Sequence, residues 1–289
     1  MRKTIDNIME IIIFVCGMLS VVFVVLIFAF LFKESFTFLK DFGIVRFIIG
    51  HFWYPTSEPP SFGIFSLIMG SVLVTTGACL IAVPIGVMTA LFISEIAPKG
   101  VKDVLKSLVE LMAAIPSVVI GFVGMVTIVP IVKNIFNLPT GLTAFSGAMM
   151  LAFMAIPTIV TISEDAISSV PWQYKEGALA LGATKWQTIR RIVLKAAMPG
   201  IIAAIMLGIG RVIGETMAVM MITGNAAHIP HSIFEPVRTM TATIAAEMGE
   251  TVREGMHYKS LFAIGFVLFV ITFMVNFLAD LFLGKNKNL

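Results

Sequence analysis

Six long apolar runs constrain the fold of this chain more strongly than any other feature of its sequence. They cover approximately residues 8–32, 64–93, 105–132, 146–162, 199–223 and 260–283. A helix needs about 20 apolar residues to cross the ~30 Å hydrocarbon core of a bilayer, and several of these runs exceed that length. We therefore predict one transmembrane domain over residues 1–289, with six spans.

Helices are the structure that suits these runs. Within hydrocarbon, only α-helices and closed β-barrels pair every backbone N–H and C=O group. Barrel strands would alternate apolar and polar residues, whereas these runs are continuously apolar. Composition agrees, since 58% of the 289 residues are hydrophobic and only 13% are charged. The predicted fold class is an all-α membrane protein.

The distribution of lysine and arginine predicts the orientation of the chain. Cytoplasmic loops of membrane proteins carry an excess of these residues. With the N-terminus inside, 12 of the 20 lie in cytoplasmic segments, seven lie outside and Arg211 lies in a span. We therefore expect a multi-pass protein of the cell (inner or plasma) membrane, in contact with lipid, with both termini cytoplasmic. The sequence suggests no nucleic-acid partner.

One long polar, basic segment, residues 168–199, separates the fourth and fifth runs. With both termini inside, this segment is cytoplasmic, and its sequence predicts two short helices joined by a tight turn. Proline suits the first turn of a helix, so the first helix should begin near Pro171, with Ser168 or Ser169 as its cap. Glycine is a common C-terminal stop, so this helix should end at Gly182.

The second short helix should begin at a capping box. In such a box, the side chains of Thr184 and Gln187 would each accept a hydrogen bond from the backbone of the other residue. The whole segment has two interpretations. It is either a loop kept in the cytoplasm by its charges, or a docking element whose capped helix enters the groove of a partner. The pattern alone leaves both open.

Two charged residues lie deep in the fifth apolar run. Arg211 is near the middle of that run, and Glu215 follows four residues later. This spacing puts both on one face of a helix, where they could form a structural ion pair. Alternatively, this face lines a translocation pathway, in which the planar guanidinium of the arginine meets the oxygens of an anion. We favour the pathway, because ionisable residues inside a membrane are commonly functional.

Motifs for other kinds of chemistry are missing from the sequence. It contains no phosphate-binding loop and no HExxH or GxSxG motif. If ATP powers transport, a partner chain must therefore bind it, and we expect no cofactor on this chain. Cys16 and Cys79 lie in apolar runs and indicate no disulfide, and nothing indicates a metal site. The aromatic and proline-rich stretch Phe52–Pro60, in a predicted outer loop, could receive a soluble partner or form a lid.

The basic segment also resembles a known motif. Its pattern is similar to the EAA loop of the inner-membrane permeases of binding-protein-dependent ABC importers, Glu-Ala-Ala-x3-Gly-x9-Ile-x-Leu-Pro. The corresponding positions are Glu176, Gly177, Ala178, Gly182, Ile192 and Leu194. Two departures occur, because Gly177 replaces the middle alanine and Lys195 replaces the proline. The resemblance implies that the helix before Gly182 docks in a cleft of the ATPase.

Three further stretches narrow the resemblance to the phosphate-specific permeases. These are Ile81–Pro98, Ala113–Gly124 and Gly210–Val219. The long first outer loop and Thr241–Gly249 look more like the PstC type than its PstA sibling. The resemblance implies a type I ABC importer permease fold and import of inorganic phosphate. It also implies a PstA-like second permease, a PstB-like ATPase dimer that binds ATP, and an external phosphate-binding protein.

Other functions stay open from the residues alone. An arginine in mid-membrane indicates an anion but does not identify phosphate, so a permease for sulfate or molybdate is an alternative. An ion-coupled secondary transporter, with Arg211 and Glu215 as a proton relay, is another. A membrane enzyme or sensor is disfavoured, because the sequence offers no catalytic constellation.

Overall fold

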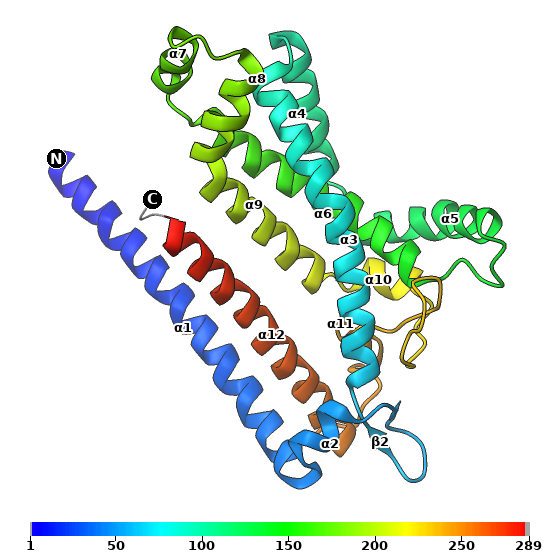
Figure 1. The fold of residues 1–289 in the computed structure, drawn as a ribbon. Helices are drawn as coiled ribbons and strands as arrows, with labels where there is room; N and C mark the ends of the chain where they lie inside the picture. Colours follow the sequence, from blue (N-terminus) through cyan, green and yellow to red (C-terminus); the bar gives the residue numbers. More distant parts are fainter. Residues whose placement is uncertain (1, 287–289) are drawn as a thin grey trace.

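A computed structural model describes residues 2–286, and the side chains of residues 1–6, 8, 280 and 282–289 lie outside this description. The regular secondary structure of the described chain is helical apart from one short hairpin (Figure 1). Its helices are α1 (Arg2–Phe42), α2 (Ile44–Ile49), α3 (Phe65–Leu91), α4 (Lys99–Ala113), α5 (Ser117–Ile135), α6 (Ala144–Ser168), α7 (Trp172–Ala180), α8 (Lys185–Thr188), α9 (Leu194–Gly214), α10 (Met217–Ile222), α11 (Met240–Glu247) and α12 (Met256–Asn286).

Two π-helical turns and two strands complete the secondary structure. The turn η1 (Phe92–Ile96) follows α3, and η2 (Ile189–Val193) joins α8 to α9 without a break. The strands β1 (Trp53–Tyr54) and β2 (Ser61–Phe62) pair antiparallel. A π turn is rare and occurs mostly as a single bulge inside a helix, frequently at a functional site.

The prediction of six spans is confirmed. Within residues 2–286, six helical segments are long and apolar enough to cross a membrane: Met9–Phe42, Phe65–Ile96, Ser117–Ile135, Ala144–Ser168, Lys185–Gly214 and Met256–Ala279. Most are longer than the predicted runs, because each helix continues into polar residues beyond the hydrophobic stretch. The first helix, for example, extends ten residues past the predicted end, to Phe42.

The third predicted span, residues 105–132, is wrong as a single helix. It divides at Pro116, whose backbone is extended, with ψ 139°. Proline has no N–H group to donate and disfavours a helical conformation at the residue before it, so the helix ends there. Of the two parts, α5 is apolar as far as Lys133 in its last turn and is one of the six spans, whereas α4 carries several charged residues and is not.

The long helix α6 forms the centre of the bundle and packs on α3 and α9. Glycines on both neighbours allow the close approach. A Cβ at Gly86 of α3 would lie 2.7 Å from Ile159 Cγ2, and one at Gly208 of α9 would lie 2.6 Å from Ile159 Cγ1. Small residues at helix crossings are typical of membrane bundles, where packing rather than hydrophobicity drives association.

The first and last helices form a separate layer beside this bundle. Figure 1 shows α1 and α12 side by side, with the start of α1 and the end of α12 at the same end of the molecule as α7. Aromatic rings pack between the two helices. The ring centroid of Phe28 lies 5.4 Å from that of Phe269 and 6.0 Å from that of Phe266. This arrangement agrees with the predicted common side of the two termini and the basic segment.

The opposite end is a folded cap rather than an extended loop. Phe38, Phe47, Trp53 and Phe62 form an aromatic cluster there. The Trp53 indole N–H donates to both carboxylate oxygens of Glu247, at 3.0 and 3.1 Å. The cap also includes the short helix α11, whose Met240 and Ile244 pack in the same cluster.

Candidate functional site

The helix α7 stands out from the bundle at one end of the molecule (Figure 1). None of its residues is buried. The structure places its beginning at Pro171, which takes the N-cap position. The expectation that Ser168 or Ser169 caps this helix is wrong, because both belong to the end of α6. Ser168 Oγ donates to Glu164, and Ser169 Oγ donates to the Ala166 carbonyl.

The end of α7 follows the prediction. Gly182 has φ +81°, in the left-handed region that glycine adopts without strain. Its N–H donates to the Leu179 carbonyl at 2.9 Å, and the Ala183 N–H donates to the Ala178 carbonyl at 3.1 Å. Gly177 is different, because a Cβ there would meet nothing within 4 Å. The alanine expected by the EAA pattern would therefore fit at Gly177.

The second predicted helix begins as expected but does not remain short. Both hydrogen bonds of the capping box are present between Thr184 and Gln187, at 2.9 and 3.3 Å. From there the helix runs on through η2 into α9, as one segment to Gly214. Lys195, at the position of the motif proline, lies inside this helix, so the chain makes no break there.

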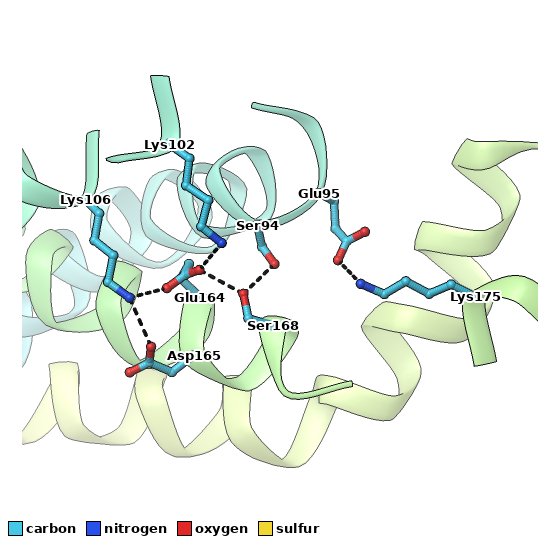
Figure 2. A network of polar contacts seen from close by, with 8 residues as sticks. All are labelled: Ser94, Glu95, Lys102, Lys106, Glu164, Asp165, Ser168 and Lys175. Carbon is cyan, nitrogen blue, oxygen red and sulfur yellow. Dashed lines mark hydrogen bonds and ion pairs between the residues drawn. The ribbon is translucent and has the colours of Figure 1, made fainter. Parts of the chain in front are cut away.

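Glu164, in the last turns of α6, is the centre of a polar network at the α7 end (Figure 2). Its side chain is only 4% exposed and lies 2.9 Å from both Lys102 Nζ and Lys106 Nζ of α4. Lys106 Nζ also lies 3.4 Å from the exposed carboxylate of Asp165. The hydrogen bond to Glu164 raises the pKa of Lys106. The buried carboxylate thus ties α6 to α4 through two cations.

The network continues through η1 to α7. Ser168, which donates to Glu164 at 2.8 Å, lies 3.0 Å from Ser94 Oγ. The neighbouring Glu95 Oε1 lies 2.6 Å from Lys175 Nζ of α7. Sequence reasoning missed these contacts. The four-residue spacing of Lys102 and Lys106 puts both on one face of an amphipathic helix, but it does not identify their partner.

The ion pair between Arg211 and Glu215, the less favoured of the two interpretations, is not formed. The helix α9 ends at Gly214, and Glu215 has an extended backbone with ψ 132°. The four-residue spacing therefore no longer places the two side chains on one helical face. Instead, Glu215 Oε1 accepts the Ala218 N–H at 3.2 Å, in the first turn of α10. A carboxylate at a helix N-terminus is favoured by its free N–H groups and by the helix dipole.

Arg211 lies on an open face of the bundle. Among the described residues, the structure records no ion pair or hydrogen bond for its guanidinium. Leu207, about one helical turn before Arg211 on α9, is 56% exposed. A Cβ at Gly210 or Gly214 would meet nothing within 4 Å. The fifth span thus presents an uncovered, mostly apolar surface with one cation in it.

The described part of the chain offers no metal centre. It contains no group of three or more His, Cys, Asp or Glu residues placed to hold a metal ion. Cys16 and Cys79 are not joined in a disulfide.

Residues 82–287 match the family described as the binding-protein-dependent transport system inner membrane component. The chain belongs to this family. The match includes α7, the polar network and Arg211. The EAA-like pattern therefore lies on an exposed helix of a transport permease. Membership of this family also means that the chain is a multi-pass membrane protein rather than an ATPase.

Transport permeases from several organisms are similar to this permease over most of its length. It is 37% identical to the phosphate transport system permease protein PstC of Mesorhizobium japonicum, over 85% of this chain and 80% of the relative. It is 31% identical to the probable phosphate transport system permease protein PstC of Methanocaldococcus jannaschii, over 98% and 96%. A probable ABC transporter permease protein of Bacillus subtilis, YqgH, is 39% identical over 84% and 79%. The permease is therefore of the PstC type.

Solved structures confirm the predicted ABC importer permease fold. A chain of the bacterial alginate ABC transporter, in complex with its pentasaccharide-bound periplasmic protein, matches with a TM-score of 0.61 and 19% identity, over 92% of both chains. A chain of the inward-facing MetNI methionine ABC transporter also matches with a TM-score of 0.61, at 18% identity, over 80% of this permease and 99% of that chain.

Proposed function

We propose that this permease is the membrane subunit of an ABC importer for inorganic phosphate, powered by ATP hydrolysis on a partner subunit. The observation that carries this proposal is the 37% identity, over 85% of the chain, to a phosphate transport system permease. The exposed helix α7 supports it, because a permease without a nucleotide-binding motif needs a surface that receives the motor.

In this proposal, α7 is the coupling helix, and the ATPase covers it from the cytoplasm. Trp172 and Leu181 are 61% and 91% exposed, which is unusual for large apolar side chains unless a partner covers them. The residues that set the surface and shape of the helix are Glu176, Gly177, Ala178 and Gly182. The orientation follows, with α7 and both termini in the cytoplasm.

The translocation pathway in this proposal follows the open face of the fifth span. Arg211 presents its guanidinium to the passing anion, and its planar donors suit phosphate oxygens. Glu215 contributes by ending α9 and holding α10. A second permease, PstA-like, would cover this face and complete the path, since a cation facing lipid directly would be costly.

Two soluble partners complete the complex in this proposal. A PstB-like ATPase dimer binds ATP on the cytoplasmic side, and an external phosphate-binding protein docks on the cap that contains β1 and β2. Closure of the ATPase dimer would move α7, and the helices would rock between inward-facing and outward-facing states.

Another oxyanion, sulfate or molybdate, is the second candidate substrate, because a guanidinium binds oxyanions of several kinds. A secondary transporter that uses Arg211 and Glu215 as a proton relay receives no support, since the two residues do not pair. The test is uptake of radiolabelled phosphate by the whole complex in proteoliposomes, with sulfate and molybdate as competitors. We expect neither to compete. Strong inhibition by either anion would instead assign the permease to that substrate.

A further inference from the structure

The helix α7 is held in place by very few side chains. Most of its side chains face away from the bundle, including Trp172, Tyr174 and Glu176. Lys175 and Ala178 are less exposed, and the charged side chain of Lys175 is only 13% exposed. The chain connects α7 directly to α6 at one end and to the α8–α9 helix at the other. No backbone link joins it to α3, the third helix of the central bundle.

Lys175 supplies that missing link. Its Nζ lies 2.6 Å from Glu95 Oε1, and the Glu95 side chain is only 9% exposed. The ammonium also lies 5.7 Å from the ring centroid of Trp172 on α7. Charges shielded from water to this extent must stay paired, because removing one partner leaves the other uncompensated. The ion pair therefore fixes the distance between α7 and the end of α3.

Glu95 is placed by an unusual piece of backbone. It lies in η1, where the Ala97 N–H donates to the Phe92 carbonyl at 2.8 Å, five residues back. Ser94, beside it, joins the network that leads through Ser168 to Glu164 (Figure 2). The polar contacts thus run from α4 through α6 to Ser94 of η1, and the ion pair of the next residue, Glu95, leads on to α7.

We propose that Lys175 and Glu95 are positioning residues that make α7 and the inner end of α3 move as one body. The proposal rests on the proposed function, in which the ATPase moves α7. Without the pair, α7 could turn about its two backbone connections, at Pro171 and Gly182, and leave α3 in place. With the pair, a push on α7 reaches α3, and through the packed core it reaches α6 and α9.

The test is the amount of phosphate transported per ATP hydrolysed by the whole complex in proteoliposomes. The Glu95→Gln and Lys175→Met variants should assemble with the ATPase and still hydrolyse ATP. The amount of phosphate that they transport per ATP should fall by about tenfold or more. Lys175→Arg keeps the charge and should retain transport. The exchange of both charges, Glu95→Lys with Lys175→Glu, should restore much of what either single change loses.

Lys99→Met and Glu110→Gln are matched controls. Both residues are exposed on α4, and among the described residues no side-chain hydrogen bond or ion pair is recorded for either. They should leave the transport ratio unchanged. Unaltered ratios in Glu95→Gln and Lys175→Met would overturn the inference, and so would loss of ATPase binding that the exchanged pair does not repair. Failure of the unmodified complex to take up phosphate would overturn the proposed function instead, before any variant is compared.

Discussion

Arg211 and Glu215 are four residues apart, yet the helix ends between them, and the Glu215 carboxylate binds the Ala218 N–H rather than the guanidinium. The arginine is therefore left without a partner recorded among the described residues, on a face that the chain itself leaves open. A cation in that position is available to a ligand, whereas an internal ion pair would not be.

The first prediction concerns Arg211. Arg211→Gln should abolish phosphate uptake while leaving assembly intact, because the side chain is exposed and supports no other residue. Its effect on the free energy of unfolding should be within about 0.5 kcal/mol, as for other surface substitutions. Uptake and co-purification of the same preparation measure both quantities. Normal uptake by Arg211→Gln would remove the arginine from the pathway.

The two boundaries of the fifth span, near Gly182 and at Gly214, show where sequence reasoning succeeded and where it failed. The apolar run and the turn at Gly182 were predictable, since both follow from local chemistry. The break at Gly214 was not, because nothing in the local sequence forbids the helix from continuing. It depends partly on a contact from far along the chain, in which Thr241 Oγ1 donates to the Glu215 carbonyl at 2.9 Å.

The second prediction compares two glycines of the basic segment. Gly182→Ala forces a side chain into the left-handed region and should destabilise the end of α7 by about 1–2 kcal/mol. ATPase co-purification and ATP-coupled uptake should fall together. Gly177→Ala is the matched control, because it has open space and restores the family alanine. Equal effects of the two substitutions would show that the shape of the turn does not matter.

The third prediction concerns the buried carboxylate of α6. Glu164→Leu would leave Lys102 and Lys106, which are 32% and 41% exposed, without their shared partner and should lower the free energy of unfolding by about 1–3 kcal/mol. Asp165→Asn, at the neighbouring exposed position, should change it by less than about 1 kcal/mol. Thermal unfolding in detergent measures both. A similar small shift for the two variants would mean that the network adds nothing to stability.

These ion pairs could not be read from the sequence. The apolar runs predict that α4 and α6 exist, but pairing Lys102 with Glu164 requires knowing how the two helices pack. The carboxylate itself lies near the end of a span, where it would ordinarily face water. The order of helices in the bundle, set by tight contacts such as Gly86 on Ile159, decides this instead.

The fourth prediction concerns the outer cap. Tyr54 is exposed, whereas Trp53 beside it is buried and hydrogen-bonded to Glu247. Tyr54→Ala should weaken docking of the external binding protein without unfolding the permease. Trp53→Ala should cost about 3–5 kcal/mol of stability, as for other buried aromatic residues. Binding measured on immobilised complex, with unfolding as a control, separates the two. Unchanged affinity for Tyr54→Ala would make the cap a lid rather than a docking surface.

The most direct test of the account is phosphate uptake into proteoliposomes, with and without the ATPase and ATP. We expect uptake only when the permease, its partner permease, the ATPase and ATP are all present, with the binding protein supplying phosphate from outside. Omission of the ATPase, or a change in α7 that stops its docking, should reduce uptake to the level of empty vesicles. Phosphate uptake by this chain alone, without ATP, would contradict the account, because α7 would then have no motor to couple to.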